Sequence, residues 1–414
     1  MANSKKAVKL AAETIALFLI FNALAWQATI EEYFPKASLF DEIALLYMLM
    51  LYFLPGVQRL PRKVTYYFLM FLTVSGISTI LSTVGRGITP IVLDLATTLK
   101  PYLFFVCLFG VSKVCFIKLK EYLIKSWCLL IPVIFLSGIT NPFTQVFPSF
   151  DERLGVPAFH FILDNPGWYG NVIICILAVF FSAKYQWRFA YIVMLIVSGY
   201  LSLRGKTLVA ISSLIIMTCA VKFNFYERYC HIKRKYLAEY RPKKSHVIFA
   251  LLILTSLGLP QALHYFGGEV LTPRSVLLIT SVDIANENFP LGSGLSTFGS
   301  PSAKIFYSPL YIEYGFNEIY GLNEHEPKFL NDNFWPTIIA QSGYLGFILY
   351  SLFFMSMMSE SVKLCSSNKK KMISAMFVVV SLLLSTLGSA IFTSSLGMLH
   401  LMSIFVIAGN NERN

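Results

Sequence analysis

Residues 290–299 read PLGSGLSTFG, a glycine-rich stretch with neither a helical nor a strand period. Residues 331–346 read NDNFWPTIIAQSGYLG and continue directly into an apolar helix. Both stretches border the one long polar interval of the chain, which runs from Leu263 to Asn333. Long loops between apolar helices usually carry function. We therefore interpret this interval as a lid that also supplies half of an active site.

The composition outside this interval is that of a membrane protein. The 414 residues are 56% hydrophobic and 14% charged, with a mean hydropathy of +0.63. Repeated apolar runs match the ~20 residues that a helix needs to cross a ~30 Å hydrocarbon core, where helices satisfy their own backbone groups. The sequence predicts an all-α polytopic membrane protein, a single membrane domain (1–414) with about twelve transmembrane helices: 8–29, 40–57, 64–83, 88–111, 121–139, 168–183, 189–203, 206–223, 246–262, 334–358, 372–391 and 393–409.

The distribution of lysine and arginine along the chain predicts the orientation of these helices in the membrane. The net charge is +12, and most of the 34 lysines and arginines fall on alternate connections and on the termini. Under the positive-inside rule, both termini are cytoplasmic, and loops 140–167 and 263–333 lie outside. The basic run 222–244 alternates with tyrosines, as in some nucleic-acid patches. We interpret it instead as a cytoplasmic loop that touches anionic lipid, and we expect no nucleic-acid partner.

Several chemistries have no candidate residues in this chain. The seven cysteines fall in predicted helices or on the inner side, so neither a disulfide framework nor a metal site is expected. The sequence has no Asp-x-Asp and no Walker glycine loop, so it offers no seat for a nucleotide sugar or ATP. We expect no cofactor.

Two charged residues fall inside the predicted fourth helix, Asp94 and Lys100. A lone charge at mid-membrane costs at least ~2.5 kcal/mol. Six residues separate the two, which places them about 120° apart on the helix, so they are not an obvious pair. Lys100 is therefore expected either to pair with another helix or to face a wet cavity. Asp41 and Glu42, just inside the second helix, are interpreted as structural residues solvated at the interface.

Three arginines lie on three outer connections. Arg153 precedes an Asn-Pro-Gly turn that opens a helix, Arg204 shares a very tight turn with Lys206, and Arg274 begins the long interval. Arginine stays charged and binds phosphate through two hydrogen bonds, so a diphosphate at the outer surface is a natural ligand. For Arg204 and Lys206 the alternative is that they extend to phospholipid head groups, and for Arg153 the alternative is a solvated charge in an exposed loop.

The long interval has the composition of a carbohydrate-binding surface. It holds eight acids, three cations and five noted aromatic residues, Tyr307, Tyr311, Tyr314, Phe316 and Tyr320. Carboxylates and amides bind sugar hydroxyls, and flat rings cover sugar faces. A loop that serves only as a polar cap would have a similar composition.

Five motifs together resemble the O-antigen polymerase and ligase superfamily. They are Arg153-Leu154-Gly155 with Asn165-Pro166, Ser202-Leu203-Arg204-Gly205, Arg274 followed by residues 290–294, Asp332-Asn333, and Gly343-Tyr344-Leu345-Gly346. The resemblance covers most of residues 140–350, whereas the first 140 residues match only in hydropathy. It implies an enzyme of the bacterial inner membrane that acts on undecaprenyl-diphosphate-linked glycans at the periplasmic face.

One departure from the family pattern favours a Wzy-type polymerase. Ligases of this superfamily place His-Asn eleven residues before the Gly-x-x-Gly element, where this chain has Asp332-Asn333. The resemblance thus implies Asp332 as general base on the acceptor hydroxyl, with His325 or Glu326 as alternatives. If His325 replaces the ligase histidine, the ligase reaction stays open. Asp332 could equally be a helix N-cap, although Asn333 could also cap.

The expected function is therefore a metal- and nucleotide-independent glycosyltransferase that polymerises lipid-linked repeat units. Arg204 and Arg274 would hold the diphosphate, and Arg153 would position one of the two lipid-linked substrates. A polysaccharide chain-length regulator is an expected partner of such an enzyme. A ligase that transfers glycan to lipid A-core and a lipid-linked oligosaccharide flippase or other transporter remain alternatives. A transporter should bury several charges at mid-membrane, where this chain has mainly Asp94 and Lys100.

Overall fold

A computed structural model describes residues 2–53, 61–147, 152–153, 155–222 and 272–409. This part of the chain is almost entirely helical, and its strands are the two of one short hairpin. The first half contains α1 Ala2–Tyr33, η1 Pro35–Leu39, α2 Phe40–Tyr52, α3 Arg62–Leu81, α4 Ile88–Gly110, α5 Lys113–Thr144, β1 Glu152–Arg153, β2 Val156–Pro157, α6 Pro166–Ser182, α7 Arg188–Leu201 and α8 Gly205–Lys222.

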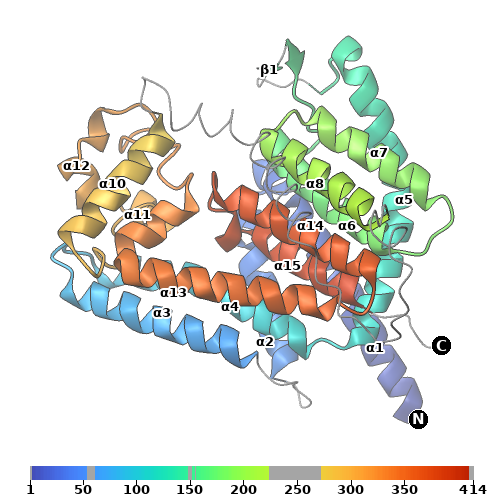
Figure 1. Cartoon of the computed structure of the whole chain (residues 1–414), viewed down its shortest axis with the longest axis horizontal. Helices are drawn as coiled ribbons and strands as arrows, with labels where there is room; N and C mark the ends of the chain where they lie inside the picture. The colour runs from blue at the N-terminus through green and yellow to red at the C-terminus, as the bar shows by residue number, and fades with distance from the viewer. Residues whose placement is uncertain (1, 54–60, 148–151, 154, 223–271, 410–414) are drawn as a thin grey trace, which may run out of the picture.

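The second half begins with short helices and ends with long ones. Its elements are α10 Pro273–Glu287, α11 Pro301–Ile305, α12 Pro309–Glu313, η2 Phe316–Glu318, α13 Phe334–Leu364, α14 Lys369–Thr386, η3 Ile391–Thr393 and α15 Ser395–Ala408. Figure 1 shows α10, α11 and α12 gathered at one end of the molecule, apart from α5, α6 and α7. The long helices α3 and α13 run side by side beneath them.

Five helices within the described residues are long and apolar enough to cross a membrane. They are α3, α4, α5, α13 and the Ala7–Tyr33 part of α1. Four shorter apolar helices, α6, α7, most of α8 and α15, accompany them. Eleven of the twelve predicted ranges coincide with helices in the described residues. Residues 54–57 and 223 of these ranges, and the whole predicted helix 246–262, lie outside the described residues. The helical fold is thus confirmed, whereas the number of crossings and the loop topology stay predictions.

The glycine-rich stretch closes a break in α13. At Gly343 the backbone leaves the helix (φ 63°, ψ −169°), which frees the carbonyls of Ala340 and Gln341. The amides of Ser293 and Gly294 donate to these two carbonyls at 2.8 and 2.9 Å. In return, the amide of Leu345 donates to the carbonyl of Pro290. The stretch therefore satisfies backbone groups that a broken helix would leave unpaired.

Two charged residues of α4 have partners on other elements. Lys100 Nζ contacts Asp41 Oδ2 at 2.7 Å and Glu42 Oε1 at 2.5 Å, both on α2, so it pairs with another helix. Asp94 accepts the backbone N–H of Ser296 at 2.5 Å. Asp41 is buried rather than solvated at the interface as expected, because the ammonium of Lys100 replaces water. These side chains hold α2 and the glycine-rich stretch against α4.

The aromatic residues of the long interval do not form an open surface for sugars. Tyr311 and Phe316 are fully buried and stack with ring centroids 5.4 Å apart. They belong to a small apolar core that also includes Phe298 and Leu330. Tyr320 alone among the five is largely exposed, at 64%. Composition could not distinguish these roles, because α11, α12 and η2 need a core of their own.

Candidate functional site

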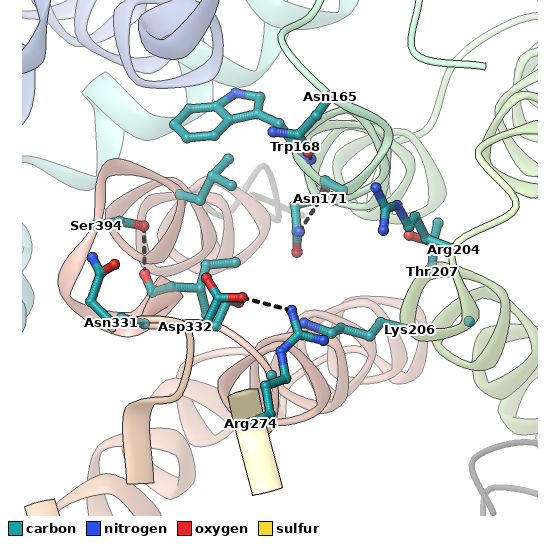
Figure 2. Close-up of a pocket in the computed structure, with 17 residues that line it drawn as sticks. Asn165, Trp168, Asn171, Arg204, Lys206, Thr207, Arg274, Asn331, Asp332 and Ser394 are labelled. Atoms are coloured by element: carbon teal, nitrogen blue, oxygen red, sulfur yellow. Dashed lines mark hydrogen bonds and ion pairs between the residues drawn. The ribbon is translucent and has the colours of Figure 1, made fainter. Parts of the chain in front are cut away.

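The candidate site is a cavity of about 440 Å³ that is lined by charged and polar side chains and opens where five segments meet (Figure 2). These are the start of α6, the α7–α8 turn, the start of α10, the residues just before α13, and the link from α14 to α15. Its lining residues are Asn165, Gly167, Trp168, Asn171, Arg204, Gly205, Lys206, Thr207, Arg274, Asn331, Asp332, Gly388, Ser389, Ala390, Ile391, Ser394 and Leu396.

Two of its three cations come from the α7–α8 turn. Ser202 ends α7 by donating its hydroxyl to the carbonyl of Gly199 at 2.7 Å, and it is completely buried. Leu203 then takes a left-handed conformation (φ 50°), which turns the chain sharply into α8. Arg204 and Lys206 therefore leave the same turn toward one cavity, as Figure 2 shows.

The third cation is paired with the only carboxylate among the described lining residues. Arg274 Nη2 contacts Asp332 Oδ2 at 3.0 Å, and both side chains are partly buried, 22% and 30% exposed. Asn333 donates its amide to the main-chain carbonyl of Arg274 at 3.1 Å, so the two segments are tied twice. Thr272 caps α10 by accepting the amide of Ser275, which fixes the helix that carries Arg274.

Two glycines allow the close approach that the cavity requires. A Cβ on Gly388 would lie 3.0 Å from Lys206 Nζ and about 4.0 Å from Arg274 Nη1. A Cβ on Gly170 would lie only 2.1 Å from Thr207 Oγ1, so α6 and α8 could not pack at this distance. Gly170 thus permits the close packing of α6 on α8, and Gly388 leaves room for the end of the Lys206 side chain.

Five helices begin at this cavity. The first turns of α6, α8 and α10 and the residues at the N-terminal ends of α13 and α15 all contribute lining residues. Each N-terminus carries partial positive charge. With three cations facing one carboxylate, the electrostatic field favours an anion with several oxygens, such as a phosphate or diphosphate.

A flat ring and amides complete the wall opposite the cations. Trp168 lines the cavity, and its indole N–H is held by the carbonyl of Ala25 at 2.8 Å. Asn171 is oriented by the hydroxyl of Ser385, which donates to its Oδ1 at 3.1 Å. An aromatic face beside amide groups suits a sugar ring.

Of the six site residues predicted from the sequence, the structure places three in this cavity and three elsewhere. Arg204, Arg274 and Asp332 share this cavity. Arg153 lines a separate cavity of about 220 Å³, between the β1–β2 hairpin and the end of α7. His325 and Glu326 do not line the 440 Å³ cavity; both are exposed, and Glu326 pairs with Lys328 at 3.3 Å.

The glycine-rich stretch is also absent from this cavity. None of the described lining residues comes from 290–299, which is instead packed against α3 and α13. Within the long interval, Arg274, Asn331 and Asp332 line the cavity, whereas the glycines of residues 290–299 support the break in α13. The expectation that the whole interval forms a lid stays a prediction. Conversely, residues 388–396 were missed, since their hydropathy merges with the predicted helices on either side.

Comparison with protein-family models and with curated proteins finds no match for this chain.

Proposed function

We propose that this chain is a membrane glycosyltransferase that polymerises glycan repeat units carried on undecaprenyl diphosphate. One observation carries the proposal: Arg204, Lys206 and Arg274 converge with Asp332 in a single cavity at five helix N-termini. Such a site stabilises the negative charge that a diphosphate leaving group develops. The motif resemblance supplies the class of substrate.

The chemical step needs one base and one stabilised leaving group. The acceptor hydroxyl attacks the anomeric carbon of the donor and gives its proton to the carboxylate of Asp332. A new carbon–oxygen glycosidic bond forms, and the bond from the anomeric carbon to the phosphate oxygen breaks. The electron pair of that bond goes to undecaprenyl diphosphate, beside Arg204, Lys206 and Arg274. Neither a nucleotide nor a metal takes part in this balance.

The size of the cavity is compatible with these groups. A volume of about 440 Å³ lies within the range of small-molecule sites and accommodates a diphosphate with the adjoining sugar. The rest of the polymer and the lipid chain must extend beyond it. In this proposal Arg153 positions the second lipid-linked substrate from its neighbouring cavity, which Leu203 of the α7–α8 turn also lines.

The proposed setting is the inner membrane of a bacterium, with the cavity on the periplasmic side and both termini in the cytoplasm. A chain-length regulator is a proposed partner in this setting. The five long apolar helices support the membrane location, and the distribution of basic residues supports the sidedness.

The test is a reconstitution with purified protein and short lipid-linked repeat units, without ATP, an ion gradient or added metal. Longer lipid-linked products would support the polymerase. Transfer to lipid A-core would replace it with the ligase, and movement of substrate across vesicles without new bonds would replace it with a transporter. Wild-type polymer from Arg204→Ala or Arg274→Ala would remove the proposed role of that residue.

A further inference from the structure

A second cavity, of about 630 Å³, lies at the other end of the helices that border the first. α6 and α15 begin at the 440 Å³ cavity and end at this one, while α14 runs in the opposite direction. α14 has 18 residues, which corresponds to about 27 Å of helix, close to the thickness of a hydrocarbon core. The two cavities therefore lie about one membrane thickness apart.

The second cavity is strongly basic. Among the described residues that line it, Glu121 is the one carboxylate. Six cations line the same cavity: Lys120, Lys184, Arg188, Lys369, Lys370 and Lys371. The positive-inside rule accounts for cations at this end of the helices, but it does not require them to enclose one cavity.

The ends of two helices hold three of these cations in place. Lys120 Nζ donates to the carbonyl of Ser182 at 3.2 Å, and Arg188 Nη1 donates to the carbonyl of Ala183 at 2.8 Å. Lys371 Nζ donates to the carbonyl of Gly409 at 2.9 Å. These carbonyls belong to the C-terminal ends of α6 and α15, where cations are favoured. The positive groups are thus positioned by the fold.

The first turn of α14 departs from the usual charge pattern of helices. It consists of Lys369, Lys370 and Lys371 with no acidic residue, although a helix N-terminus by itself disfavours cations. A concentration of like charge that opposes local stability is characteristic of a binding site for the opposite charge.

We propose that this cavity binds a phosphate-bearing anion on the cytoplasmic side, through the lining side chains of Lys184, Arg188 and Lys370. The shared chemistry is a phosphate group, which the head group of an anionic lipid or a free diphosphate can supply. The proposal does not depend on the activity assigned to the 440 Å³ cavity, because it uses different residues at the opposite end of the helices.

The experiment measures anion binding by native mass spectrometry of the detergent-solubilised full chain. The probes are phosphatidylglycerol, inorganic diphosphate and, as a neutral reference, phosphatidylcholine. The variants are the double substitution Lys184→Gln with Arg188→Gln, and the milder Lys370→Gln on an exposed side chain that should not disturb folding. A control double variant, Lys63→Gln with Lys363→Gln, removes two exposed cations outside the cavity.

Loss of a charge-assisted hydrogen bond should raise the Kd of the bound anion roughly tenfold in the cavity variants. The control variant should bind like the wild type. Preference for phosphatidylglycerol would identify a lipid head-group site, and preference for diphosphate would identify a site for a soluble anion. The proposal is overturned if neither anion binds better than phosphatidylcholine, or if the control weakens binding as much as the cavity variants.

Discussion

Gly343→Ala should severely destabilise the protein, because this glycine lies at the break of α13. Its φ of 63° and ψ of −169° belong to a region that side-chain-bearing residues rarely adopt. In addition, a Cβ would lie 2.4 Å from the carbonyl carbon of Leu291 and 2.6 Å from the carbonyl oxygen of Pro290. Both obstacles are backbone atoms, so no side-chain rotation relieves the contact.

The magnitude follows from two contributions. Backbone strain at such a position costs about 1–3 kcal/mol. Moving the backbone at Leu291 to ordinary contact distance weakens the hydrogen bonds from Ser293, Gly294 and Leu345, each worth about 1 kcal/mol. With complete loss of these three hydrogen bonds the combined cost is about 4–6 kcal/mol, a large part of the typical 5–15 kcal/mol of a folded protein.

Thermal unfolding in detergent, followed by the monodisperse fraction on size exclusion, measures this effect. Gly315→Ala is the matched control: its φ is +71°, yet no atom lies within 4 Å of the added Cβ. Gly315 lies in the ordinary left-handed region (ψ 21°), which alanine adopts at a smaller cost than the conformation of Gly343, and its added Cβ meets no atom. Gly315→Ala should therefore lower the melting temperature far less. If Gly343→Ala and Gly315→Ala melted together, the proposed contact between the glycine-rich stretch and α13 would be refuted.

Three further predictions concern single side chains. Asp332→Asn should reduce polymer formation in cells at least ~100-fold at unchanged protein level, because it removes the proposed base. His325→Ala changes an exposed residue outside the cavity and should leave polymer formation nearly normal. The reverse result would favour the ligase reaction. Lys206→Gln should lower kcat for lipid-linked substrate, because Lys206 is proposed to stabilise the charge that develops on the leaving diphosphate; an unchanged kcat in the reconstituted assay would contradict that role. Lys100→Met should cost about 3–5 kcal/mol, since it leaves buried Asp41 without its cation, and adding Asp41→Asn should recover part of the lost melting temperature.

The helices could be predicted because their signal is local. Apolar runs long enough to cross a bilayer stand out in any window, and eleven of twelve predicted ranges are helices here. The sequence left open whether Lys100 pairs with another helix or faces a wet cavity, because its partner Asp41 lies 59 residues away. The roles of Tyr311 and Phe316 were not predictable either. An aromatic ring that covers a sugar and one that fills a small core look alike in a polar loop.

The candidate site, too, was predictable where the signal is local and unpredictable where it depends on contacts between distant helices. Arg204 and Arg274 could be predicted as site residues because arginine is rare on the outer turns of a hydrophobic chain, and both line the 440 Å³ cavity. Arg153 met the same criterion, yet the short β1–β2 hairpin directs it to a different cavity. Gly388 carried no signal at all. A Cβ at this position would lie 3.0 Å from Lys206 Nζ, a proximity that exists only once α8 and α14 are packed together. Residue type therefore identifies which side chains can bind a diphosphate, whereas the close approaches between distant helices determine which of them bind it together.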